Sequence, residues 1–134
     1  MLSIFPSLLT YGIVAPFILR MTVGLFFLDR GYRHLKEEKA GVVADMTKWL
    51  HAFAKPFVVL VALVEVAIGL SLIAGFLTQI AAIFGIIYMF KMLYFKVECP
   101  HFAKHQRLVY ILFIVILFSL LITGPGIIAV DLPL

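Results

Sequence analysis

Cysteine and charge are both scarce in this sequence, and each shortage excludes a class of protein. The one cysteine, Cys99, rules out an intrachain disulfide and a Cys-x-x-Cys redox motif. Only 13% of the 134 residues are charged, whereas 64% are hydrophobic and the mean hydropathy is +1.16. A soluble domain of this length cannot bury so much apolar surface, so we expect the solvent around the chain to be lipid.

Sequence motifs of the common enzyme classes are absent as well. There is no glycine-rich dinucleotide loop, no phosphate-binding P-loop, no His-Glu-x-x-His motif and no Ser-His-Asp arrangement. The sequence therefore gives no indication of a nucleotide cofactor or of hydrolytic chemistry.

The long apolar runs predict an all-α integral membrane protein, folded as a four-helix bundle in one domain of residues 1–134. One crossing needs about 20 residues, and we expect spans at about 11–28, 57–75, 78–95 and 108–124. The run 56–90 has a single charged residue, Glu65, and is too long for one crossing. Gly75 and the polar residues after it mark the reversal between the second and third spans.

The segment between the first two spans predicts an additional helix. Its second half has apolar residues at helical spacing: Val43, Met46, Trp49, Leu50 and Phe53. This spacing indicates an amphipathic helix in the first long loop, lying at the membrane interface with its tryptophan at headgroup level. The alternative is an ordinary linker helix packed against the end of the bundle.

The distribution of positive charge predicts the orientation. Of the eleven Lys and Arg residues, Arg20 lies inside the first apolar run and the other ten fall in 30–55 or 91–107. With four spans these two segments lie on one side, which the positive-inside rule makes cytoplasmic, and both termini then lie outside. We therefore interpret the net charge of +4 as a sign of membrane topology. A multi-pass protein of the inner (cell) membrane is expected, with no nucleic-acid partner.

Two charged residues lie inside predicted spans. Arg20 is in the first apolar run, and Glu65 is near the middle of the second. A charge at the bilayer centre costs roughly 2.5–3.5 kcal/mol on insertion scales, so such a residue usually has a partner or a function. Counted from the polar ends of their runs, both lie about 13 Å from the same membrane face. We predict that they face each other in the bundle interior, as a structural ion pair or as a site for a quinone head group, a proton or an anion.

Further candidates lie on the third span and at small residues. Lys91 is near the end of the third span, where its stem can reach the headgroups; alternatively it is a basic group at the mouth of a cavity, with Tyr88 one turn away. Gly24, Gly69 and Gly85 are expected at close helix–helix contacts, because small residues let backbones approach.

The loop after the third span contains residues with metal-ligand chemistry, Cys99, His101 and His105. A tetrahedral site needs three or four ligands, and only His34 or His51 on the same side could complete one. We therefore expect no metal here, and interpret the three residues as surface or partner-contact residues. No pair of histidines lies at the depth of the axial ligands of an intramembrane b-type haem.

Three stretches of the sequence resemble the DoxX family of membrane proteins. They are Arg20-x-x-x-Gly24 with Gly31-x-Arg33-x-Leu35, then Glu65-x-x-x-Gly69 with Gly75-Phe-Leu-Thr78, and finally Gly124-Pro125-Gly126 with Asp131. The resemblance covers nearly the whole chain. Gln79 stands where a basic residue is common in the family, and Ala129 replaces a serine, which bears on the substrate more than on the fold.

The resemblance implies a four-helix membrane bundle associated with respiratory or redox machinery, including a quinone-linked thiosulfate oxidoreductase subunit. The function expected from it is a small membrane subunit that supports a redox process, in an accessory role to a membrane oxidoreductase, with a quinone or lipid-like ligand near Arg20 and Glu65. A redox partner protein and a homo-oligomer are the expected assemblies. Two alternatives stay open. One is an oligomeric small-molecule or proton-linked transporter, and the other is a scaffold that recruits a soluble partner through residues 96–107.

Overall fold

The computed structural model describes residues 11–12, 14–36, 39–96, 103, 105–124, 126 and 129–130. The elements in this part of the chain are all helical: α1 (Val14–Leu35), α2 (Lys39–Leu50), the 3-10 helix η2 (His51–Phe53), α3 (Ala54–Ala74), α4 (Thr78–Phe95) and α5 (Arg107–Thr123). The expected all-α class is confirmed. Two stretches, within Ala40–Ala74 and Thr78–Phe95, are long and apolar enough to cross a membrane by length and composition, and α5 is a shorter apolar helix.

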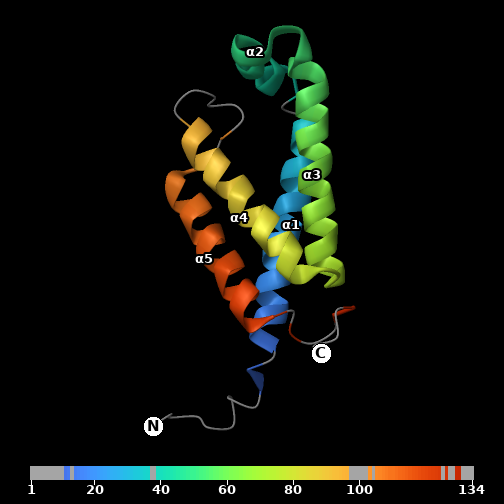
Figure 1. Cartoon of the computed structure of the whole chain (residues 1–134), viewed down its shortest axis with the longest axis vertical. Coiled ribbons are helices and arrows are strands. Elements are labelled where there is room, and N and C mark those ends of the chain that lie inside the picture. Colours follow the sequence, from blue (N-terminus) through green and yellow to red (C-terminus); the bar gives the residue numbers. More distant parts are fainter. Residues whose placement is uncertain are drawn as a thin grey trace.

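The four long helices are arranged as two pairs (Figure 1). Helix α1 packs along α3, and α4 packs along α5. The short turn Gly75–Leu77 joins α3 to α4, and from this turn the two helices diverge towards the end of the molecule where α2 lies. Gly75 and Leu77 both have left-handed backbone conformations, with φ of +67° and +50°. A bulky residue such as leucine rarely adopts this conformation, so the turn is a constrained one.

Glycines allow α1 and α3 to approach each other closely. A Cβ on Gly24 would lie 2.7 Å from Ile73 Cγ1 and 3.0 Å from the backbone oxygen of Gly69. A Cβ on Gly69 would lie 2.9 Å from the backbone oxygen of Gly24, and one on Gly31 would lie 3.0 Å from that of Ala62. These contacts favour one register of the two helices, because sliding would bring larger residues to positions where there is room only for glycine.

Helix α1 continues to Leu35, beyond the predicted end of the first span at residue 28. Its last two turns are amphipathic. The outer side carries an exposed ion pair between Arg33 Nε and Asp29 Oδ2, 2.9 Å apart and one turn from each other. The inner side carries Arg30 and His34, which are both buried. The first charged residues after the apolar run therefore do not end the helix.

Helix α2 lies across the end of the bundle and contacts α3 and α1 (Figure 1). Val42 and Met46 are buried against the bundle, whereas Trp49 and Phe53 remain exposed. The predicted apolar stripe is thus divided between two environments. One part packs on the bundle end, as the linker-helix alternative expects, and the other part stays on the surface.

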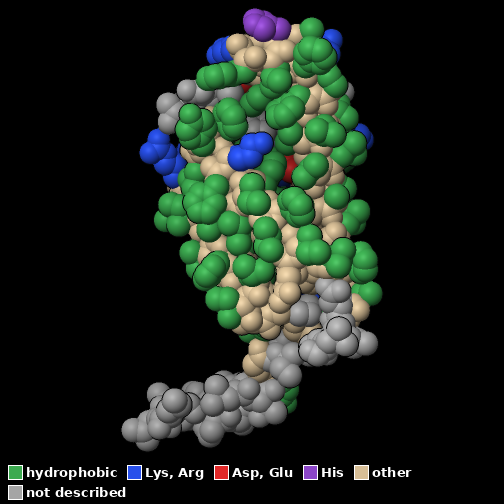
Figure 2. All heavy atoms as spheres, in the orientation of Figure 1, with side chains coloured by type: hydrophobic (Ala, Val, Ile, Leu, Met, Phe, Trp, Pro, Cys, Tyr) green, Lys and Arg blue, Asp and Glu red, His purple; other side chains and the backbone are tan. Residues whose placement is uncertain are grey.

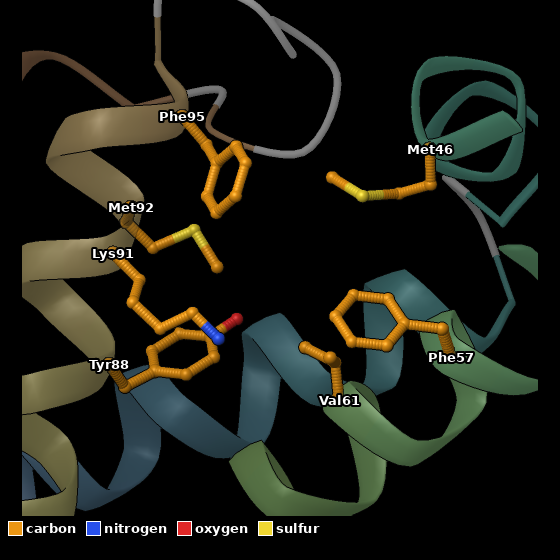
Figure 3. Close-up of a pocket in the computed structure, with 7 residues that line it drawn as sticks. All are labelled: Met46, Phe57, Val61, Tyr88, Lys91, Met92 and Phe95. Carbon is orange, nitrogen blue, oxygen red and sulfur yellow. The ribbon is translucent and has the colours of Figure 1, made fainter. Parts of the chain in front are cut away.

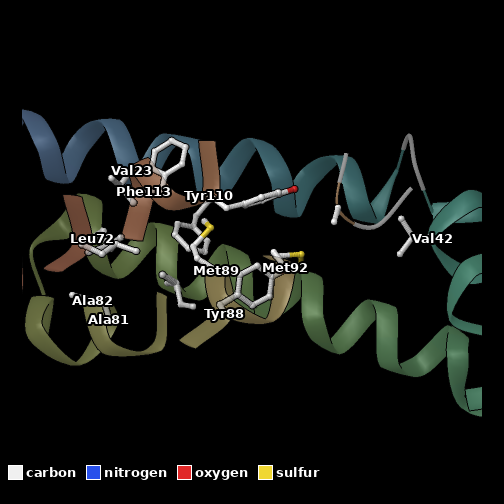
Figure 4. Packing of buried hydrophobic residues seen from close by; sticks show 14 of the residues in the cluster. Val23, Val42, Leu72, Ala81, Ala82, Tyr88, Met89, Met92, Tyr110 and Phe113 are labelled. Carbon is white, nitrogen blue, oxygen red and sulfur yellow. The ribbon is translucent and has the colours of Figure 1, made fainter. Parts of the chain in front are cut away.

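The interior and the exterior are both apolar. Buried side chains from all four long helices form a continuous core, labelled in part in Figure 4. The outer faces of α3, α4 and α5 expose large hydrophobic residues such as Leu60, Phe84 and Val115, each more than half exposed. Figure 2 shows hydrophobic side chains over most of the visible face below α2, with Lys and Arg gathered in the upper half. Such a surface is suited to lipid contact.

Candidate functional site

Glu65 on α3 is the centre of a set of buried polar side chains. Its carboxylate is fully buried and has three partners. Arg30 Nε donates to Oε1 at 2.8 Å, and the hydroxyl of Tyr88 donates to the same oxygen. His34 Nδ1 lies 2.7 Å from Oε2, and with an ionised carboxylate the proton of this bond is on Nδ1. Two helices, α1 and α4, thus supply the donors that a buried carboxylate requires.

Arg30 extends this network to α5. Its Nη1 donates to the hydroxyl of Tyr110 at 3.1 Å, and its Nη2 lies 2.8 Å from the sulfur of Met92. The guanidinium carbon lies 5.3 Å from the ring centroid of Tyr110 and 6.0 Å from that of Tyr88, within the range of cation–π attraction. One guanidinium therefore contacts side chains of α3, α4 and α5.

We call Arg30, His34, Glu65, Tyr88 and Tyr110 the polar cluster. Its members come from all four long helices, and each side chain is buried. The charges of the arginine and the glutamate compensate each other, and the hydroxyls of Tyr88 and Tyr110 hydrogen-bond to Glu65 and Arg30 respectively. Such a network adds little net stability over a well-packed apolar core, but loss of one charged member leaves the other buried without compensation.

The segment before α5 is tied to the polar cluster through Tyr110. The backbone N–H of His105 donates to the Tyr110 hydroxyl at 3.2 Å. The amine of Lys96, at the end of α4, donates to the backbone oxygens of Ala103, at 3.2 Å, and of His105. The hydroxyl of Tyr110 therefore accepts both from this loop and from Arg30.

A small pocket opens beside the polar cluster, in the space where α3 and α4 diverge (Figures 1 and 3). We call it the lateral pocket, and its lining residues are Met46 of α2, Phe57 and Val61 of α3, and Tyr88, Lys91, Met92 and Phe95 of α4. Its internal volume is about 20 Å³, room for about one water molecule. Tyr88 belongs both to this wall and to the polar cluster, so the pocket reaches a direct partner of Glu65.

Arg20 and Glu65, predicted to pair, are not partners in the structure. The carboxylate of Glu65 is bonded to Arg30, His34 and Tyr88. Arg20 is fully buried near the other end of α3, where its Nη1 lies 2.5 Å from the position that a Cβ on Gly75 would take.

The error in the predicted pairing comes from the helix end. The predicted depth of Arg20 depends on the first helix ending near Asp29, but α1 continues past that residue. The contacts of Gly24 with Gly69 and of Gly31 with Ala62 then set a different register between α1 and α3. In this register a different arginine, Arg30, lies opposite Glu65.

The other sequence candidates fall into three groups. Tyr88 and Lys91 share the wall of the lateral pocket. Gly85 packs on α5, where its Cβ would lie 3.0 Å from Leu117 Cδ1, and Gly124 and Gly126 follow α5 with φ of +78° and +73°. The remaining candidates, Cys99, His101, Pro125 and Asp131, lie outside the described residues.

His105, one of the three candidate metal ligands, lies within the described residues. The ring of His105 lies 5.2 Å from that of Phe26 and 6.3 Å from that of Tyr110, in an aromatic environment. Among the residues that the structure describes, no three His, Cys, Asp or Glu side chains lie close enough together to hold a metal ion.

Sequence reasoning missed Arg30, His34 and Tyr110 as site residues, although a signal for two of them existed. Gly24 and Gly31 already define the inner face of α1, and Arg30 and His34 lie next to and one turn beyond that stripe. Tyr110 lies near a helix end, a position typical of interfacial aromatic residues, and nothing in the local sequence distinguishes it from one of these.

The family model described as DoxX matches residues 15–96 of the chain. The match includes α2, α3 and α4, nearly all of α1, every lining residue of the lateral pocket, and the polar cluster except Tyr110. Searches of curated proteins and of solved structures give no match.

Proposed function

Because this chain belongs to the DoxX family, we propose that it is a small integral membrane protein that supports a redox process by binding a quinone or another lipid-like ligand in the lateral pocket. The apolar outer faces of the helices and the two stretches long enough to span a bilayer support the membrane location. An inner-membrane protein with its basic segments in the cytoplasm, a redox partner protein and a homo-oligomeric assembly are parts of this proposal.

The observation that carries the proposal is the double role of Tyr88. Its side chain lines a pocket between diverging helices, and its hydroxyl donates to the buried carboxylate of Glu65. A ligand dissolved in the bilayer could approach sideways, between α3 and α4, without crossing water. Its head group would then meet a side chain that is hydrogen-bonded to a buried, charge-compensated network.

The chemistry of the pocket suits a head group with oxygen acceptors and an apolar tail. The amine of Lys91 is a donor, the hydroxyl oxygen of Tyr88 is an acceptor, and the remaining lining side chains are apolar or aromatic. Space for one water molecule is too little for a quinone ring, so binding requires the walls to part. Lys91 is exposed and the rings of Phe57 and Phe95 are partly exposed, so these wall groups can move at less cost than the buried ones.

Removal of the Tyr88 hydroxyl tests the proposal. In Tyr88→Phe the ring remains, but the link between the pocket and Glu65 is lost, and we expect the affinity for a short-chain ubiquinone to fall about tenfold, the usual effect of one buried hydrogen bond. Quenching of the protein's fluorescence by the quinone in detergent micelles measures this affinity. Mass spectrometry of gently purified protein identifies the ligand that remains bound. Tyr94→Phe is the matched control, because Tyr94 lies on α4 and is 75% exposed. Equal affinities for all three proteins would contradict the proposal.

A proton-linked carrier is a second candidate, favoured by one observation. Glu65 is hydrogen-bonded to two other groups that exchange protons, His34 and Tyr88, inside the helix bundle. Such buried ionisable groups are common on proton pathways. This function predicts proton flux in liposomes that is lost in Glu65→Gln, whereas ligand binding alone predicts no flux in either protein.

A further inference from the structure

We propose that the lateral pocket is selective for an anionic head group, and that its ligand is a single-chain amphiphile with a carboxylate, held by Lys91. This inference deepens the proposed function and rests on it, since it presupposes that a lipid-like ligand enters the pocket.

The direction of the Lys91 side chain is the first step. Lys91 lies one turn before the end of α4, from where a lysine can extend past the helix end to the headgroups. Lys91 is instead one of the lining residues of the pocket, and Figure 3 shows its side chain on the same wall as that of Tyr88. Its side chain is exposed, so the positive charge belongs to the open side of the pocket wall that Lys91 shares with Tyr88 of the polar cluster.

The charges around this amine are the second step. Among the described residues Lys91 has no ion pair, and the other lining side chains carry no acidic group. The nearest buried carboxylate in the network, Glu65, already accepts from Arg30 and His34. Lys91 is exposed on the lipid-facing side of α4, and in an apolar surrounding its ammonium group would be stabilised by a negative charge that a ligand supplies.

The size of the pocket decides between anions. With room for about one water molecule, the pocket must widen for any head group, and a small, planar carboxylate requires less widening than a phosphodiester with its second substituent. The tail must lie outside, and the neighbouring outer faces of α3 and α4 expose apolar side chains for it, including Val64 and Ile87. A carboxylate on one alkyl chain fits both conditions.

The experiment compares ligands that differ only in the head group. The full chain is placed in phosphatidylcholine nanodiscs, and bound cis-parinaric acid is displaced with oleate or with oleyl alcohol, after subtraction of empty nanodiscs. We expect oleate to displace the probe at about a tenfold lower concentration than the alcohol, the effect of one charge-assisted hydrogen bond. In Lys91→Gln this preference disappears, and in Lys91→Arg it remains.

A second lysine provides the matched control. Lys55 is exposed at the start of α3 and does not line the pocket, so Lys55→Gln should keep the preference for oleate. Equal loss in both glutamine variants would indicate a general surface-charge effect and would overturn the inference.

The remaining outcomes separate this inference from the proposed function. Equal displacement by oleate and oleyl alcohol, together with quinone binding that depends on Tyr88, would overturn anion selectivity and leave the lateral site intact. No displaceable binding of the probe, of oleate or of quinone would overturn both. Retention of the oleate preference in Lys91→Gln, with helical content unchanged by circular dichroism, would show that another group selects the head group.

Discussion

Glu65 is held by donors of three chemical types, a guanidinium, an imidazole and a phenol. Their contributions to its stability are unequal, because only Arg30 has a fixed positive charge that matches the carboxylate. If Arg30 is removed, Tyr88 and His34 still donate hydrogen bonds, but the negative charge remains buried without a fixed counter-charge. At the scale of single residues, the Arg30–Glu65 pair is therefore the contact of the polar cluster whose loss should destabilise the protein most.

A double-mutant cycle tests this pair. We expect Arg30→Met to lower the free energy of unfolding by about 3–5 kcal/mol, as for other broken buried ion pairs, and Arg30→Met/Glu65→Gln to be less destabilised than the sum of its single variants. Unfolding in mixed micelles with increasing dodecyl sulfate measures both quantities.

The cycle of Arg20 with Glu65 is the control for this prediction. The register of α1 and α3 separates these two residues by about ten helical positions, or about 15 Å, so their effects should add within about 0.5 kcal/mol. Strong coupling between Arg20 and Glu65, or additivity between Arg30 and Glu65, would contradict the observed register.

At the scale of elements, α1 is the helix that organises the others. Its inner face presents Gly24 and Gly31 to α3, and Arg30 and His34 to the carboxylate of that helix. The glycines bring the two backbones close together, and Arg30 and His34 on neighbouring turns of α1 reach Glu65 across this contact. The close packing of α1 on α3 and the compensation of the Glu65 charge by Arg30 therefore depend on each other.

Substitution of Gly24 and of Gly85 by alanine compares a glycine that faces backbone atoms with one that faces a flexible side chain. We expect Gly24→Ala to destabilise the protein by about 1–3 kcal/mol, because the new methyl group would press on a backbone oxygen and on Ile73. Gly85→Ala should cost less, since its methyl group would meet only the flexible end of Leu117 and then Phe27 at 3.6 Å. Both changes improve helix propensity equally. The same unfolding titration measures the difference, and a larger loss in Gly85→Ala would contradict this account.

How far the sequence predicts these elements depends on what ends a helix. Lengths of apolar runs predicted three helices within a few residues, α3, α4 and α5, because their ends coincide with glycine turns or polar loops. The end of α1 was not predicted, since Asp29 and Arg33 pair on its outer side and keep the polar segment helical. The choice of Arg20 as the partner of Glu65 followed from that error. Tyr88 and Lys91 were placed correctly next to each other because they are one turn apart on the same helix.

At the scale of the whole molecule, the lateral pocket has walls from α3 and α4 and is bordered by Met46 of α2. The polar cluster and the lateral pocket lie towards the end that carries α2 and the basic segments. The turn between α3 and α4 lies at the opposite end. A membrane orientation therefore determines the leaflet from which a ligand would enter the pocket.

Labelling of single cysteines tests the predicted orientation. In a Cys99→Ser background, Phe76→Cys places a thiol at the exposed turn before α4, and Lys48→Cys places one on the exposed side of α2. Since the basic segments are expected in the cytoplasm, a membrane-impermeant maleimide should label Phe76→Cys in intact spheroplasts, and Lys48→Cys only after permeabilisation. The reverse pattern would invert the topology and leave the fold unchanged.

The turn Gly75–Leu77 is the point about which α4 would rotate relative to α3. Helix α4 has 18 residues, so it is about 27 Å long, and a rotation of about 5° at the turn displaces its other end by about 2 Å. That displacement is comparable to the van der Waals radius of a methyl group. A rotation at Gly75 and Leu77 would therefore also change, by a smaller amount, the width of the lateral pocket beside Tyr88, which lies partway along α4.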